Sequence, residues 1–133
     1  MDDLAAGRLP LRVTHNDTKL SNILLDETTG AFVCVIDLDT VMPGSSLYDF
    51  GDSIRTGACT AAEDEPDAER VDFRADMFCA YAEGFVEGTA GALTDREIAM
   101  LPDGAYIITL EQAIRFLTDY LEGDVYYHTV CRP

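Results

Sequence analysis

The sequence predicts an α+β fold, with short strands in its first third and helices in its second half. Three short segments, residues 11–14, 23–25 and 32–36, have the length and composition of strands. From Val71 onward, apolar residues recur at a four-residue spacing that is typical of helices. Hydrophobic residues make up 47% of the 133 residues, which is enough for one compact domain with a core.

A β-hairpin is expected over residues 23–36. The apolar run at 23–25 and the β-rich run at 32–36 are separated by a turn cluster at 26–30 that ends in glycine. Such a cluster between two strand-like runs is the usual signature of a hairpin. A polar loop, residues 15–22, lies between the strand at 11–14 and this hairpin.

Residues 37–70 show no clear periodicity and include the acidic run 63–67, so we expect an irregular, solvated connection there. The helical pattern that follows would place one apolar face on the core, formed by Phe73, Met77, Tyr81 and Phe85. Residues 94–97 form a Thr-x-x-Glu capping box that predicts the start of a second helix.

A long helix is expected over residues 106–121. Pro102 and Gly104 should interrupt the chain before it, and Gly123 should end it. The segment is apolar on most of its sides, which is typical of a helix buried against a sizeable partner.

The charge of the chain limits its partners. The formal net charge is −16, and Lys19 is the only lysine. Such a negative field repels nucleic acid and anionic lipid, so neither is expected as a partner. The sequence contains no apolar run long enough to span a membrane and no signal-peptide pattern at its start, so a cytoplasmic location is expected.

The polar loop and the end of the hairpin carry oxygen-bearing side chains at a spacing that suits phosphoryl transfer. Such chemistry needs a carboxylate beside the attacking hydroxyl and oxygen ligands for Mg²⁺. Asp17 and Asn22 lie five residues apart in the loop, and Asp37 follows the second hairpin strand. These residues predict one carboxylate for the hydroxyl, with an amide and a second carboxylate for the metal.

The loop His-Asn-Asp-Thr-Lys-Leu-Ser-Asn resembles the His-x-Asp-x-x-x-x-Asn catalytic loop of protein-kinase-like enzymes, and most of all their aminoglycoside and choline phosphotransferase branch. This resemblance implies that ATP is the phosphate donor and that Asp17 is the catalytic base. It also implies that Asn22 and Asp37 bind Mg²⁺ and that Lys19 contacts phosphate. The implied fold is a mainly helical lobe with a catalytic loop and a small hairpin.

A later triplet, Asp49-Phe50-Gly51, spells the metal-binding motif of protein kinases. We interpret it as a coincidence, because the metal-binding Asp should follow the hairpin directly, as Asp37 does. In the phosphotransferase branch, a later Asp braces the catalytic loop. The resemblance therefore implies that Asp49, together with His15, supports the loop.

Longer segments resemble the N-acetylhexosamine 1-kinase family. They begin at Thr14, Cys34, Tyr48 and Thr109 and are spread over most of the length of the chain. That family transfers the γ-phosphate of ATP to the anomeric hydroxyl of N-acetylglucosamine or N-acetylgalactosamine.

This resemblance also implies that the sugar contacts Asp17, Arg115 and Tyr126. Two plainer interpretations remain open for the last two residues. Arg115 lies four residues after Glu111, which is the spacing of an ordinary helical ion pair. Tyr126 is equally consistent with an aromatic residue in a core.

Kinases of this superfamily have a second lobe that holds the ATP phosphates with a glycine-rich loop and a lysine. The 133 residues contain no Gly-x-Gly-x-x-Gly motif and no second lysine. We therefore expect residues 1–133 to be the C-terminal catalytic lobe, with the ATP-binding lobe elsewhere. Such a lobe alone should have little activity and could self-associate through exposed apolar surface.

Three other functions stay open. The segment from Val35 to Val41 spells the first motif of haloacid-dehalogenase-type phosphatases, with Asp37 as nucleophile and Asp39 as general acid. That fold also requires a later lysine and alternating strands and helices. Within kinases, the acceptor could instead be a cation such as choline or an aminoglycoside. Finally, the chain could be an inactive, sugar-binding remnant.

Overall fold

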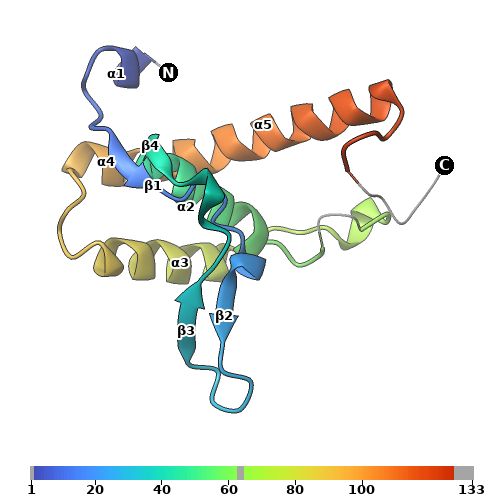
Figure 1. The fold of residues 1–133 in the computed structure, drawn as a ribbon, viewed down its shortest axis with the longest axis horizontal. Coiled ribbons are helices and arrows are strands. Elements are labelled where there is room, and N and C mark those ends of the chain that lie inside the picture. Colours follow the sequence, from blue (N-terminus) through green and yellow to red (C-terminus); the bar gives the residue numbers. More distant parts are fainter. Residues whose placement is uncertain (1, 63–64, 128–133) are drawn as a thin grey trace.

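The computed structural model describes residues 2–62 and 65–127, and it confirms the α+β class (Figure 1). In chain order, the helices and strands are α1 (Asp2–Ala5), β1 (Arg12–Thr14), β2 (Ile23–Leu25), β3 (Phe32–Val35), β4 (Met42–Gly44), α2 (Ser46–Gly57), α3 (Ala75–Gly88), α4 (Asp95–Ala99) and α5 (Leu101–Glu122). None of the helices in these two ranges is both long and apolar enough to cross a membrane.

The strands form two separate antiparallel pairs. The predicted hairpin is confirmed: β2 pairs with β3, with Ile23 opposite Val35, and it projects away from the helices (Figure 1). The predicted strand at 11–14 is also present, as β1. Its partner is β4, which the sequence did not predict because it lies inside the segment expected to be irregular.

The expectation of an irregular connection over residues 37–70 was wrong, because α2 lies within it. Ser45 begins this helix by accepting a hydrogen bond from the backbone N–H of Leu47. Phe50 and Ile54 on α2 are 0% and 4% exposed and form the centre of the core. Glycine and polar residues lower the helix propensity of this segment, so burial rather than local preference stabilises α2.

The predicted apolar face of the next helix was only partly right. Helix α3 begins at Ala75, so Phe73 precedes it and is 59% exposed. Met77 is also exposed, whereas Tyr81 and Phe85 pack against the core as expected. The sequence pattern missed Phe78, whose ring lies edge-on to that of Phe50 with centroids 5.8 Å apart.

The long helix was predicted at the right place with the wrong start. Pro102 and Gly104 do not interrupt the chain but belong to the beginning of α5. A proline there removes no helical hydrogen bond, because the first N–H groups of a helix have no partner within it. Gly123 ends the helix in a left-handed conformation, as predicted. Within the described residues, several apolar side chains of α5 are exposed rather than buried: Tyr106, Leu110, Ile114, Leu117, Tyr120 and Leu121.

Helices α2 and α5 cross at very short range through two glycines. A Cβ atom added to Gly51 would lie 2.4 Å from the carbonyl oxygen of Gly104, and one added to Gly104 would lie 2.4 Å from the carbonyl oxygen of Leu47. Real Cβ atoms do not approach an oxygen so closely, so neither position accepts a side chain without a shift of the helices. Because the two helices lie so close, polar side chains of α5, including Glu111 and Gln112, lie beside α2.

Candidate active site

The catalytic-loop candidate follows β1 and is held by the side chain of Asp49 on α2. The Asp49 carboxylate accepts hydrogen bonds from the backbone N–H groups of His15, at 3.0 Å, and Asn16, at 2.8 Å. The hydroxyl of Thr18 also donates to the carbonyl oxygen of Asp49, at 2.5 Å. These three hydrogen bonds join the loop to α2 at Asp49.

Asn16 adopts a left-handed conformation in this loop, with a φ of 62°. Asparagine tolerates this region better than most residues because its short side chain forms local hydrogen bonds. Here its amide Nδ2 donates to the carbonyl oxygen of Thr40, at 3.0 Å. The loop is therefore tied both to α2 and to the segment that follows Asp37.

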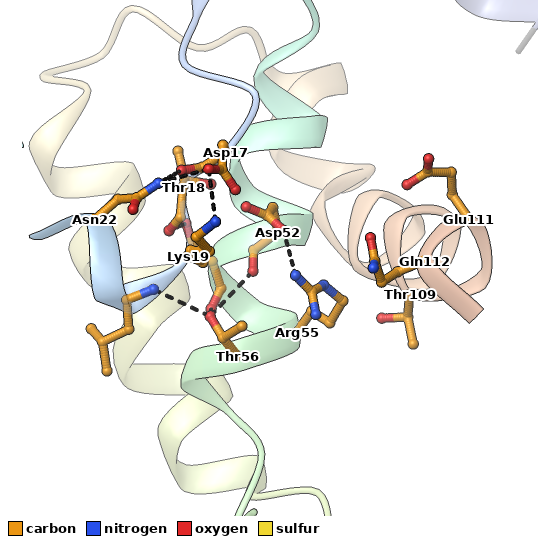
Figure 2. A network of polar contacts seen from close by, with 12 residues as sticks. Asp17, Thr18, Lys19, Asn22, Asp52, Arg55, Thr56, Thr109, Glu111 and Gln112 are labelled. Carbon is orange, nitrogen blue, oxygen red and sulfur yellow. Dashed lines mark hydrogen bonds and ion pairs between the residues drawn. The ribbon is translucent and has the colours of Figure 1, made fainter. Parts of the chain in front are cut away.

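One oxygen of the Asp17 carboxylate is held in place and the other is not. Oδ2 lies 2.8 Å from Nδ2 of Asn22 and 2.9 Å from Nζ of Lys19 (Figure 2). Within residues 2–62 and 65–127, no group donates a hydrogen bond to Oδ1. Asp17 therefore presents an oriented carboxylate with one oxygen available for a ligand.

Asp37 follows directly after the residue that pairs with Asn22, because the hairpin ladder continues beyond its strands. The N–H of Ile36 donates to the carbonyl oxygen of Asn22, at 3.0 Å, so the following residue, Asp37, begins beside it. Asp37 has a φ of 64°, an uncommon conformation that concentrates at functional sites.

The ring of His15 joins the loop to the same end of the hairpin. Its Nδ1 accepts a hydrogen bond from the N–H of Asp17, at 3.3 Å, so the proton lies on Nε2. Nε2 then donates to the carbonyl oxygen of Ile36, at 3.0 Å. His15 thus links the residue before Asp37 to Asp17 itself.

The expected metal ligands carry the oxygen types that Mg²⁺ prefers. Asp17, Asn22 and Asp37 offer carboxylate and amide oxygens, and Mg²⁺ is usually held by one or two carboxylates together with waters and substrate phosphates. In the part of the chain that the structure describes, no group of three or more His, Cys, Asp or Glu side chains is arranged so that it could hold a metal ion.

A cavity of about 370 Å³ opens beside Asp17, between α2 and α5. This volume is within the range of small-molecule sites. The catalytic loop contributes Asn16 and Asp17 to its lining, and both helices add polar side chains. Figure 2 shows Asp52 and Arg55 of α2 on the side that faces Glu111 and Gln112 of α5.

The structure separates the two residues that the resemblance assigned to sugar contact. Arg115 lines the cavity beside Asp17, and its Nε lies 3.8 Å from Glu111 Oε1, so the helical ion pair is present as well. Tyr126 lies instead at a second depression, near Asp119, and is 72% exposed. Arg115 lines both the cavity beside Asp17 and this second depression, whereas Tyr126 lines only the second depression.

Sequence reasoning missed Asp52, Arg55 and Gln112, which also line the cavity. The first two escaped notice because α2 was not expected. Their spacing carried a usable signal, since Asp49, Asp52 and Arg55 recur every three residues and so share one side of a helix.

The comparison with known families agrees with this geometry. The model of the phosphotransferase enzyme family, APH, matches residues 1–83, which include the loop, the hairpin, Asp37 and α2. The phosphatase alternative, in contrast, requires strands that alternate with helices, whereas the described strands form two antiparallel pairs. The match covers more than half of the chain, and the chain therefore belongs to the phosphotransferase enzyme family, the group of the aminoglycoside and choline phosphotransferases.

Proposed function

We propose that this chain supplies the acceptor-binding and catalytic half of an ATP-dependent kinase. Its acceptor is the anomeric hydroxyl of N-acetylglucosamine or N-acetylgalactosamine. The observation that carries the proposal is the Asp17 carboxylate beside the cavity, with Oδ2 held by Lys19 and Asn22 and Oδ1 available.

In the proposed reaction, Asp17 Oδ1 accepts a hydrogen bond from the acceptor hydroxyl and takes its proton as the oxygen attacks. A bond forms between that oxygen and the γ-phosphorus, and the bond from the γ-phosphorus to the β,γ-bridging oxygen breaks, which releases ADP. Lys19, 2.9 Å from Asp17, would neutralise charge on the transferred group. His15 and Asp49 keep the loop in position through the contacts described above.

Asn22 and Asp37 would hold Mg²⁺. When bound, Mg²⁺ neutralises charge on the β- and γ-phosphates of ATP. The Ile36–Asn22 hydrogen bond supports this assignment, because it starts Asp37 beside Asn22.

We further propose that a glycine-rich lobe outside these 133 residues provides the remaining phosphate contacts. The β2–β3 hairpin supports this idea, because Leu25, Phe32 and Val33 are 55%, 64% and 56% exposed and would suit a covering lobe. Without that lobe, the exposed apolar surface should favour self-association. Sedimentation velocity over a range of concentrations would detect it, and a strictly monomeric chain would contradict it.

The choice of a hexosamine rests on the four resembling segments and on Arg115 beside the cavity. Calorimetric titration of the chain with N-acetylglucosamine, N-acetylgalactosamine, choline and an aminoglycoside tests this choice. We expect the two hexosamines to bind. Binding of choline or the aminoglycoside alone would contradict the sugar assignment and support a cationic acceptor.

Phosphoryl transfer is tested by ³¹P NMR with Mg²⁺-ATP and N-acetylglucosamine. We expect an anomeric phosphate from the longer polypeptide that carries the glycine-rich lobe and little from the 133-residue chain. Asp17→Asn should lower kcat by about 10²- to 10⁴-fold, because general-base catalysis contributes that much, with little change in acceptor affinity. Robust transfer by the 133-residue chain would contradict the two-lobe proposal. An active Asp17→Asn variant would contradict the role of Asp17.

A further inference from the structure

The carboxylate of Asp52 lies in the wall of the cavity with only one of its oxygens satisfied. Its Oδ1 accepts a hydrogen bond from Arg55 Nη2, at 2.9 Å (Figure 2). Its Oδ2 is buried and accepts no hydrogen bond from the described residues. Asp52 as a whole is 9% exposed, so solvent does not readily satisfy this oxygen.

A buried carboxylate oxygen without a donor is costly and uncommon in folded proteins. The Asp52–Arg55 pair lies one helical turn beyond Asp49, so α2 fixes it relative to the loop that carries Asp17. The cavity lined by Asp52 is also lined by Asp17 and by Gln112 on α5. A rotation of the Asp52 side chain towards the cavity would let a donor group on a bound acceptor satisfy Oδ2.

The charges around the cavity favour a neutral acceptor. Among the described residues, three carboxylates and two guanidinium groups line it, and Lys19 pairs with Asp17, so that each of these carboxylates has a cationic partner. This balance contrasts with the net charge of −16 on the whole chain. Because these charges already form ion pairs, a charged acceptor would have to compete with them, whereas a neutral compound rich in hydroxyl groups would find both donors and acceptors.

We propose that Asp52, oriented by Arg55, determines acceptor specificity by accepting a hydrogen bond from one hydroxyl of a neutral sugar other than the hydroxyl that is phosphorylated. This inference rests on the proposed sugar kinase function and names the residue pair that recognises the sugar. The pair belongs to no motif used to identify the loop or the metal ligands.

The test uses the 133-residue chain, isothermal titration calorimetry and N-acetylglucosamine with its 3-, 4- and 6-deoxy analogues. Asp52→Asn should bind N-acetylglucosamine about 10- to 100-fold more weakly, because a hydrogen bond to a charged group is lost. One deoxy analogue should bind the wild-type chain about 10- to 100-fold more weakly than N-acetylglucosamine does. That analogue should show no further loss with Asp52→Asn, since the two changes remove the same contact.

Asp76→Asn is the matched control, because it alters another Asp–Arg pair at an exposed position of α3, away from the cavity. It should leave every affinity unchanged. If Asp52→Asn does not fold, as judged by circular dichroism, Arg55→Gln provides a second variant. It should reduce the difference in affinity between N-acetylglucosamine and the same deoxy analogue.

The outcomes separate this inference from the function on which it rests. If the wild-type chain binds hexosamines and all three deoxy analogues bind equally, the role of Asp52 is overturned while the sugar kinase proposal stands. If Asp52→Asn weakens the binding of N-acetylglucosamine and of every deoxy analogue by the same factor, Asp52 acts only on the fold. That result would also overturn its proposed role in specificity. If the wild-type chain binds no hexosamine, the proposed acceptor itself is wrong, and the inference is overturned with it.

Discussion

Arg12 and Glu97 form a two-point ion pair, with Arg12 Nε and Nη2 at 2.6 and 2.7 Å from the two oxygens of the Glu97 carboxylate. Glu97 is 1% exposed and also accepts hydrogen bonds from Ser46 Oγ and the N–H of Thr94, each at 2.8 Å. The carboxylate that completes the capping box of α4 thus also joins β1 to the start of α2. It fixes the frame from which the catalytic loop departs.

This pair predicts a specific loss of stability in acid. Hydrogen bonding from Arg12, and then from Thr94 and Ser46, lowers the pKa of Glu97 to about 2. The pKa of a Glu in an unfolded chain is about 4.3. The ionised Glu97 carboxylate therefore stabilises the fold fully above that pH, and this stabilisation is lost as the pH falls towards 2. Glu97→Gln should lower the free energy of unfolding at pH 7 by about 3 kcal/mol and flatten its dependence on pH between 5 and 2. Urea unfolding at several pH values measures both effects.

Asp76 provides the control for this experiment. A hydrogen bond from Arg74 also lowers the pKa of Asp76 to about 2, but the Asp76 side chain is 64% exposed. Solvent screens such surface pairs, so Asp76→Asn should leave the acid transition where it is. Equal shifts for Glu97→Gln and Asp76→Asn would show that burial does not distinguish the two pairs.

The glycine crossing of α2 and α5 predicts an intolerance of even one methyl group. Gly104→Ala should lower the free energy of unfolding by about 1–3 kcal/mol, because the added carbon would overlap the backbone of Leu47. Gly84→Ala in α3 is the matched control, since its Cβ would meet no atom within 4 Å. That change should instead stabilise the chain by up to about 1 kcal/mol through helix propensity. Thermal and urea unfolding of both variants would reveal the opposite signs, and a neutral Gly104→Ala would contradict the close crossing.

The contacts of Asp49 predict a local effect on the catalytic loop. Asp49→Asn removes the charge that two backbone N–H groups share, so the amide protons of His15 and Asn16 should exchange faster with solvent. Asp26→Asn is the control, because Asp26 accepts comparable bonds from Thr28 and Thr29 in the hairpin turn. Hydrogen exchange followed by NMR should show that each variant affects only its own loop. Unchanged exchange at His15 and Asn16 would refute the bracing role.

Asp37 and Asp39 separate the kinase mechanism from phosphatase chemistry. In the proposed two-lobe enzyme, Asp37→Ala should raise the Mg²⁺ concentration needed for half-maximal transfer at least about tenfold, because one of the proposed metal ligands is lost. Asp39→Ala should leave this Mg²⁺ dependence unchanged, and excess EDTA should abolish transfer by the unaltered enzyme. Loss of activity in Asp39→Ala with Mg²⁺ dependence unchanged in Asp37→Ala would contradict the assignment.

The sequence predicted the hairpin and the capping box because their information is local. Turn residues at 26–30 and the Thr94–Glu97 pair specify their structures within a few residues. Helix α2 was missed because its stability comes from burial of Phe50 and Ile54 against distant segments, which a local pattern does not reveal. The loop residues were found from a motif. The position of Asp52 at the cavity depends on how α2 packs against α5, so it became evident only from the three-dimensional structure.

Asp49 and Asp52 lie one turn apart on α2, and one holds the loop of Asp17 while the other lines the cavity. A movement of this helix that enlarged the cavity would therefore also displace the loop. Laboratory evolution towards a bulkier acceptor should consequently select substitutions on the opposite wall, at α5 positions such as Ile108 and Gln112. Over longer times, the acceptor range of this lineage is expected to diversify through α5 while the sequence of α2 changes slowly.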